Sequence, residues 1–337
     1  MDYRALVQKL GDRTNQNSQT SELILEHRTG HPNNLFACGA DVPWPETEAP
    51  GFLSFQNCPN LWTLGARPYL DKEQALEIIE EVITCANILP QRTEIKDKIY
   101  IRAYNELEQY LMSLFVYYTR KVDITKAKGK LKSWGWTKYL RQLNADSNIK
   151  AVSIVSLNYD VWLENLLDMF SIPYSIDGFS STKEKIHIYK PHGSIAFHST
   201  KRDRAAYSIP NRNSFDNHKL DEFRYDNKNL DCLNIINALI PPAGDSSRLK
   251  QSWSADIRNH IKVLAKTLKK DDSVVICGVS YWHVDRKEID TYLSEMPSDI
   301  KHLVMVNPNP PEVLNAVLMT LFDQYVVIPN STNLMKL

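Results

Sequence analysis

Glycine and cysteine are both scarce in this chain of 337 residues, which contains 11 glycines and five cysteines. The cysteines are Cys38, Cys58, Cys85, Cys232 and Cys277, and no two of them have the C-x-x-C spacing of a zinc knuckle. Their odd number and wide scatter also argue against the disulfide framework of a secreted protein. We therefore expect reduced thiols that pack as small hydrophobic side chains.

An excess of charge and a long apolar run are also missing. Forty basic residues balance forty acidic ones, so no overall field draws the chain toward nucleic acid or an anionic membrane. The longest apolar stretches fall far short of the roughly 18 residues that span a bilayer. Residues 1–4 open a charged segment without the apolar core of a signal peptide. These absences predict a soluble, cytoplasmic protein that binds neither membrane nor nucleic acid.

The apolar pattern divides the chain into regions. Residues 1–30 are polar and predict an N-terminal arm. Between residues 70 and 145, apolar residues recur at the i, i+3, i+4 spacing of amphipathic helices. We interpret this block as a helical subdomain inserted into one larger domain, which comprises residues 31–69 and 146–337.

Short apolar or β-branched runs predict the strands, and helical patterns separate several of them. The predicted strands are 35–38, 151–157, 186–189, 235–240, 273–277 and 303–306. The run at 151–157 has no helical period and predicts a strand buried on both faces. Helices are expected after Asp160, over 253–268 and around 313–321, and a long loop over 199–231. The pattern predicts an α/β fold: a Rossmann-like, mainly parallel sheet flanked by helices.

Small or hydrogen-bonding residues follow most of the predicted strands. In chain order they are Gly39, Ala40 and Asp41; Asn158, Tyr159 and Asp160; His192, Gly193 and Ser194; Gly278, Ser280, His283 and Asp285; and Asn307 and Asn309. Ligands of an open parallel sheet bind at the carboxyl ends of its strands. The sequence therefore predicts a nucleotide pocket at this edge.

Four of these segments resemble the sirtuin-like family of NAD-consuming domains. They are SLNYD (156–160), KPHGS (190–194), CGVSYWHVD (277–285) and VNPNP (306–310), which follow predicted strands in the same order as in the family. Within the family, the chain is most similar to the sirtuin-like domains of bacterial anti-phage defence proteins, over about residues 35–321.

The resemblance implies a role for each matching residue. Asn158 would hold the attacking water against the nicotinamide ribose, and His192 would act on the ribose hydroxyls as a general base. The implied cofactor-binding residues are Gly39, Ala40, Asp41, Asp160, Gly278, Ser280, Asp285 and Asn307. Of these, Asp160 would line the nicotinamide pocket, while Gly278, Ser280 and Asn307 would contact the adenosine side.

The implied activity is hydrolysis of NAD to nicotinamide and ADP-ribose, with no metal. In the resembled defence proteins this reaction depletes NAD during infection, so we expect control by homo-oligomerisation or by a separate sensor or activator protein. Breaking the nicotinamide–ribose bond needs oriented polar groups and a positioned water more than a strong nucleophile. Histidine, with an ordinary pKa of about 6.5, can accept a proton near neutral pH.

Two departures from the family leave alternatives open. The segment FACGADVP (36–43) has one glycine where the family's phosphate-binding loop has two, and it carries Asp41. The alternative function is therefore a catalytically inactive nucleotide-binding or scaffold subunit of a defence complex. The C-x-x-C zinc module of the deacylating sirtuins is absent, which argues against deacylation.

Several site residues also have plain structural interpretations. Asp160 could cap the helix that follows it, His192 could bond a loop carbonyl, and Gly278 could serve only as a turn residue. Trp134 and Trp136 stand among lysines and could stack on nucleic acid, but we expect them to pack between helices.

Overall fold

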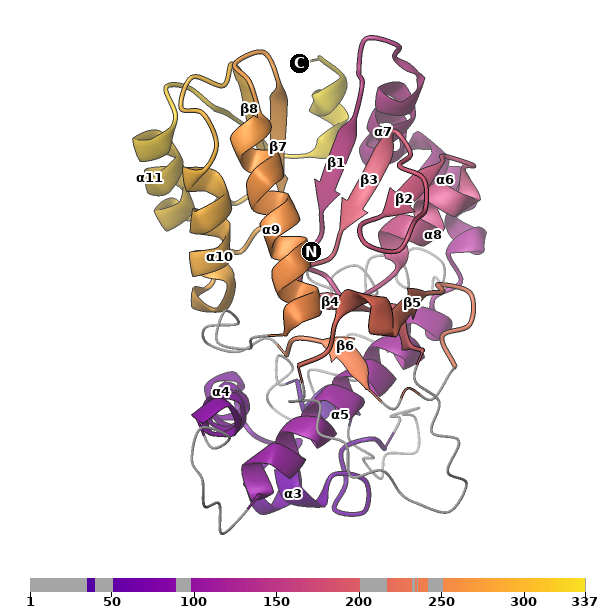
Figure 1. Cartoon of the computed structure of the whole chain (residues 1–337), viewed down its shortest axis with the longest axis vertical. Coiled ribbons are helices and arrows are strands. Elements are labelled where there is room, and N and C mark those ends of the chain that lie inside the picture. Colours follow the sequence, from indigo (N-terminus) through magenta and orange to yellow (C-terminus); the bar gives the residue numbers. More distant parts are fainter. Residues whose placement is uncertain are drawn as a thin grey trace.

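The computed structural model describes residues 35–39, 51–88, 98–200, 217–231, 234, 236–241 and 251–336. Within these residues the strands form three sheets of three strands, with helices packed around them (Figure 1). The predicted arm, residues 1–30, lies outside the described part of the chain, as do Ala40 and Asp41. No helix in the described ranges is long and apolar enough to cross a membrane.

The first sheet is parallel and consists of β1 (Val152–Val155), β2 (Tyr174–Ile176) and β3 (Ile186–Tyr189), with β3 in the centre. Helix α8 (Trp162–Met169) lies between β1 and β2 in the chain. All four residues of β3 are buried, whereas β1 is half-buried and Val155 is 38% exposed. The predicted burial of this strand on both faces is therefore wrong. Among the described strands, β1 pairs only with β3, which leaves its other edge without a partner strand there.

A second parallel sheet consists of β7 (Ser273–Cys277), β8 (His302–Val306) and β9 (Val326–Ile328). Helices α9 (Ser252–Thr267), α10 (His283–Ser294) and α11 (Glu312–Leu321) belong to this part of the chain. Leu314 and Leu318 of α11 pack in one buried cluster with Leu303 and Met305 of β8 and Leu293 of α10. The strands predicted at 273–277 and 303–306 and the helices near 253–268 and 313–321 are confirmed.

The third sheet is antiparallel, in the order β5-β4-β6. Its strands are β4 (Gly193–Ser199), β5 (Phe223–Tyr225) and β6 (Asn237–Leu239). The described strands are therefore parallel in two sheets only. The long loop predicted over 199–231 is wrong at β5, because a strand of three residues is too short to show a period of two.

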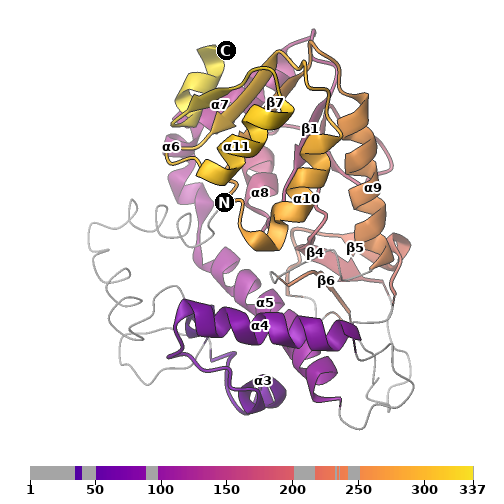
Figure 2. The ribbon, with the colours of Figure 1, turned by 90° about the vertical axis from the view of Figure 1, so that its left-hand side faces the viewer.

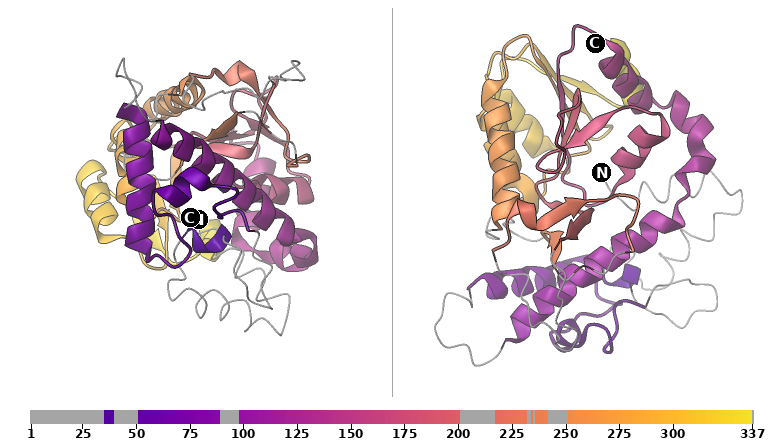
Figure 3. Two further views of the ribbon diagram at one scale, coloured as in Figure 1. Left: turned by 90° about the horizontal axis from the view of Figure 1, so that it is seen from below. Right: turned by 45° about the vertical axis from the view of Figure 1, so that its right-hand side comes forward.

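The helical pattern predicted between residues 70 and 145 is confirmed by α4 (Lys72–Ile88), α5 (Ile99–Lys121), η3 (Ile124–Ala127), α6 (Lys128–Ser133) and α7 (Gly135–Ala145). The short helix α3 (Pro59–Thr63) precedes this block. Figures 1 and 2 show α3, α4 and α5 together at one end of the molecule, next to β4 and β6. In the right-hand view of Figure 3, the magenta helices then rise along one side toward the parallel sheets.

Helix α7 packs with the C-terminal part of the chain. Its Trp136 and Tyr139 contact a buried cluster that includes Val304 of β8 and Ile328 of β9. Trp134 packs against the main core, so both tryptophans are packing residues, as expected. The final 3-10 helix, η6 (Ser331–Lys336), lies against α7.

The predicted strand at 35–38 is wrong, because residues Ala37–Gly39 form the 3-10 helix η1. Hydroxyl groups of α5 hold this segment: Tyr110 donates to the carbonyl of Leu35 at 2.7 Å, and Tyr118 donates to that of Cys38 at 3.1 Å. Contact with a helix therefore replaces pairing with a strand.

Among the described glycines, Gly193 is the one whose surroundings leave the least space for a side chain. Its φ is +86°, and a Cβ atom built there would lie 1.7 Å from the carbonyl oxygen of Ala238 in β6. We expect Gly193→Ala to lower the free energy of unfolding by about 3 kcal/mol or more, since strain and overpacking add.

The control is Gly129→Ala in α6, where a Cβ atom would meet nothing within 4 Å. This replacement should be neutral or stabilise by up to about 1 kcal/mol. Urea unfolding of both variants tests the comparison, and equal midpoints would contradict it.

Candidate functional site

His192 lies in the turn between β3 and β4, with its side chain 5% exposed. The turn is closed by a hydrogen bond from the amide of Gly193 to the carbonyl of Lys190, at 3.0 Å. Atom Nε2 of His192 is 2.9 Å from Oε2 of Glu288 and 3.9 Å from Oδ1 of Asp285. Both carboxylates belong to α10, the helix between β7 and β8, so this contact joins the β3–β4 turn to the part of the fold that contains the second parallel sheet.

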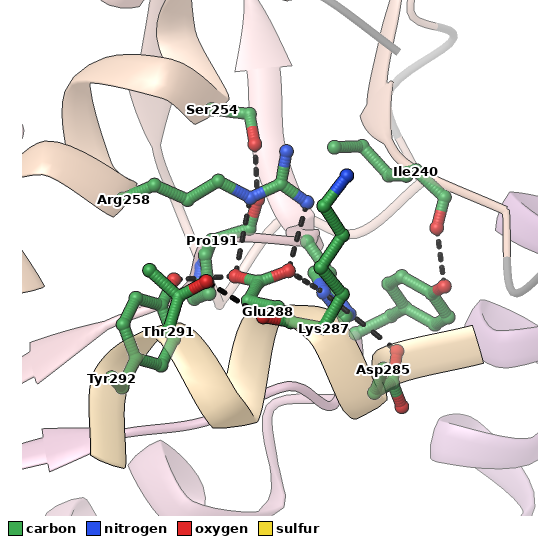
Figure 4. A network of polar contacts seen from close by, with 11 residues as sticks. Pro191, Ile240, Ser254, Arg258, Asp285, Lys287, Glu288, Thr291 and Tyr292 are labelled. Carbon is green, nitrogen blue, oxygen red and sulfur yellow. Dashed lines mark hydrogen bonds and ion pairs between the residues drawn. The ribbon is translucent and has the colours of Figure 1, made fainter. Parts of the chain in front are cut away.

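Three elements converge on the carboxylate of Glu288, as Figure 4 shows. Arg258 of α9 donates from Nε to Oε1 at 3.1 Å and from Nη2 to Oε2 at 3.0 Å, and the hydroxyl of Tyr292 donates to Oε1. Burial alone would raise the pKa of Glu288, but His192 and Arg258 outweigh it and hold that pKa well below its usual range. The carboxylate therefore stays ionised at neutral pH.

Asp285 is in a different electrostatic situation. Its side chain is 30% exposed, and burial raises its pKa despite the opposing effect of His192. At 3.9 Å its oxygen is too far from His192 for a hydrogen bond. Asp285 therefore faces the histidine without fixing it.

The loop after β1 lies directly against the start of β4. The carbonyl of Tyr159 accepts hydrogen bonds from the amide of Ile195 at 2.9 Å and from the hydroxyl of Ser194 at 3.2 Å. The hydroxyl of Tyr159 donates to the carbonyl of Ile240. Asn158, the neighbour of Tyr159, is half-buried in this loop. The structure thus brings the segments of Asn158 and His192 together.

Asp160 satisfies a free amide at the start of the helix that follows it, although the N-cap position that one interpretation of the sequence gave to Asp160 is occupied by Val161. Its Oδ1 accepts the amide of Trp162, the first residue of α8, at 3.0 Å. The residue is 7% exposed, and burial raises its pKa against the opposing charge of Lys190. An additional role in a ligand pocket stays a prediction.

A buried ion pair ties this loop to β3. The ammonium of Lys190 lies 2.8 Å from Oε1 of Glu164 in α8, and each side chain is 1% exposed. The same ammonium donates to the backbone carbonyl of Asp160. Lys190 therefore connects the end of β3 with the start of α8.

The remaining predicted residues lie at the ends of other strands or apart from them. Gly278, with φ +62°, and the exposed Ser280 follow β7, and the half-buried Asn307 follows β8, so all three are at the carboxyl edge of that sheet. Gly39 is instead buried against the ring of Tyr110. Within the described ranges, no hydrogen bond or ion pair joins His192 to Asn307 or Gly39.

Arg258, Glu288 and Tyr292 did not emerge from the sequence. One signal was present: Glu288 follows Asp285 by three residues, which places both on one face of a helix. The helix that contains Arg258 was predicted correctly, but the apolar period of a helix does not show which residues of another helix lie near it.

The described residues contain no group of three His, Cys, Asp or Glu side chains that could hold a metal ion. A cavity of about 510 Å³ is lined by residues around β2, including Asp168, Tyr174 and Tyr225, and none of the predicted site residues lines it.

The sequence matches no model of a known protein family and no curated protein.

The buried ion pair gives a stability prediction. Lys190→Met leaves the Glu164 carboxylate buried without its partner, which should cost about 3–5 kcal/mol of unfolding free energy. The double variant Lys190→Met/Glu164→Leu should recover most of this loss. Urea unfolding measures all three proteins, and a single variant that loses less than the double variant would contradict the pairing.

The depressed pKa of Glu288 gives a pH prediction. A carboxyl group whose pKa is lower in the folded state than in the unfolded state stabilises the folded protein. This stabilisation is complete above the unfolded pKa of about 4.3 and is lost as the pH falls through the folded pKa. The unfolding free energy of Glu288→Gln should therefore decline less steeply than that of the wild type between about pH 5 and 2. The exposed Glu312→Gln is the control, and parallel pH curves for all three proteins would refute the assignment.

Proposed function

We propose that the chain binds NAD at the carboxyl ends of β1, β3 and β7 and hydrolyses it to nicotinamide and ADP-ribose. The main support is the buried His192, fixed by Glu288 and placed beside the loop of Asn158. We also propose that both parallel sheets belong to one Rossmann-like domain, residues 31–69 and 146–337, into which residues 70–145 are inserted. The contact between His192 and α10 supports this arrangement.

In the proposed reaction, Asn158 and His192 each have one role. The bond between the ribose anomeric carbon and the nicotinamide nitrogen breaks, and its electron pair leaves with the nitrogen, which becomes neutral. A water held by the amide of Asn158 adds its oxygen to the anomeric carbon. His192 acts on the adjacent ribose hydroxyls, and the water proton is released, so the products are nicotinamide, ADP-ribose and one proton.

The binding roles follow the positions of the strand ends. Asp160 and Asp285 would lie on the nicotinamide side, close to His192. Gly278 and Ser280, exposed after β7, would contact the adenosine side together with Asn307. Gly278, which adopts a φ of +62°, has no Cβ atom that would keep a ligand away from the backbone.

We further propose that NAD hydrolysis serves anti-phage defence through NAD depletion. The support is the resemblance of the four segments to defence sirtuin-like domains. Control would come from homo-oligomerisation or from a separate sensor or activator protein.

One observation favours a second function, a non-catalytic nucleotide-binding or scaffold subunit. The glycine expected to approach the diphosphate, Gly39, is packed so closely that a Cβ atom there would lie 2.3 Å from Cε2 of Tyr110. Its small size is thus used for packing against α5.

Nicotinamide release from NAD by the purified chain separates the two functions. His192→Gln and Asn158→Ala should each lower the rate on the order of 10²–10⁴-fold, the usual contribution of a positioned acid–base group. The control is His302→Gln, at an exposed position of β8. A similar rate in all variants would contradict the proposed site.

A binding measurement completes this experiment. Thermal unfolding with ADP-ribose should show stabilisation of the wild type under either function. Stabilisation without nicotinamide release supports the non-catalytic subunit, and the absence of both contradicts nucleotide binding altogether.

A further inference from the structure

We infer that Glu288 is the positioning residue for His192, and that Arg258 and Tyr292 fix Glu288 in the required orientation. The inference rests on the proposed function for its catalytic consequence. Its geometric part concerns only which nitrogen of His192 carries a proton.

Four donors from three elements fix the Glu288 carboxylate. Oε2 accepts from Nε2 of His192 and Nη2 of Arg258, and Oε1 accepts from Nε of Arg258 and the hydroxyl of Tyr292. A carboxylate has about four lone-pair sites, so its capacity is filled. The side chains of Glu288 and His192 are 6% and 5% exposed, so water competes little for these bonds.

This arrangement selects one tautomer of the imidazole. Because an ionised carboxylate only accepts hydrogen bonds, the proton of neutral His192 must be on Nε2. The lone pair is then on Nδ1, which is the atom that can take a proton from a ribose hydroxyl. The imidazolium that forms lies 2.9 Å from a buried negative charge, which stabilises it.

The neighbouring charges favour Glu288 over Asp285 in this role. Asp285 is 3.9 Å from Nε2 and more exposed, and within the described ranges no guanidinium hydrogen bond holds it. Arg258 makes two hydrogen bonds to Glu288 across the α9–α10 contact. Asp285 therefore stays available to contact a ligand.

The test combines NMR of histidines labelled with ¹⁵N and the kinetics of nicotinamide release. In the wild type, the His192 signals, assigned with His192→Gln, should show a protonated Nε2 and an unprotonated Nδ1 when the imidazole is neutral. In Glu288→Gln the amide can donate to Nε2, so the tautomer with a proton on Nδ1 should appear. kcat should fall on the order of 10²-fold or more, and KM should change little.

The matched control is Glu295→Gln. Glu295 also bridges α10 to α9, through an exposed contact with Lys266 at 3.3 Å, and lies away from His192. This variant should keep the wild-type tautomer and kcat. An equal fall of kcat in both variants would make the effect of Glu288 merely structural and overturn the inference.

The two proposals can fail separately. A wild-type protein that releases no nicotinamide contradicts the proposed function, while its NMR spectrum still tests the positioning of His192. A wild-type His192 with its proton on Nδ1 overturns the inference even if the enzyme is active. This spectrum needs no folded Glu288 variant.

Discussion

The carboxylate of Glu288 is the constraint on which the candidate site depends. It is buried, ionised and shared by Arg258 of α9, Tyr292 of α10 and His192 of the β3–β4 turn. A buried charge is tolerated only when partners of this kind compensate its loss of hydration. The hydrogen bonds to Glu288 therefore hold α9, α10 and the β3–β4 turn in fixed positions relative to one another. They also fix the orientation of the His192 ring.

Helix α9 extends this constraint to the first parallel sheet. Ile257 and Ile261 are buried on one side of the helix, and Arg258 contacts Glu288. His260, two residues later, places Nδ1 2.8 Å from Oδ2 of Asp177, which follows β2. The same Asp177 also pairs with His187 of β3, at 3.2 Å. One helix thus contacts residues associated with both parallel sheets.

The loops of the site are fixed from within the first sheet as well. Lys190 and Glu164 form a buried pair that fixes the end of β3 to α8, and the carbonyl of Tyr159 joins the β1 loop to β4. Such contacts reduce the freedom of Asn158 and His192 before any ligand arrives. The proposed hydrolysis of NAD, through an oxocarbenium-like centre, would require preorganisation of this kind.

The sequence predicted the elements whose period is long enough to recognise. The period of 3.6 residues in their apolar positions predicts helices α9 and α11. Continuous apolar, β-branched runs predict the strands β7 and β8. Of the four three-residue strands, β2, β5 and β9 show no period, whereas β6 lies within the apolar run predicted at 235–240. The segment 35–38 looked like a strand, because tyrosine hydroxyls of α5, about 75 residues away, decide its conformation.

Part of the candidate site was also accessible from the sequence. Polar residues after parallel strands meet at one edge, which placed Asn158, His192 and Asp285 in one region. The network of Glu288, Arg258 and Tyr292 was not accessible, since it depends on how α9 and α10 face each other. Spacing along one chain gives the face of a helix but not the partner across it.

Hydrogen–deuterium exchange of the full chain, with and without ADP-ribose, tests most directly whether these loops form one nucleotide site. The geometry predicts simultaneous protection of residues 157–160, 190–194 and 278–285, with unchanged exchange in α11 as the internal reference. Protection confined to the cavity around β2, or no protection in any of the three loops, would contradict the site.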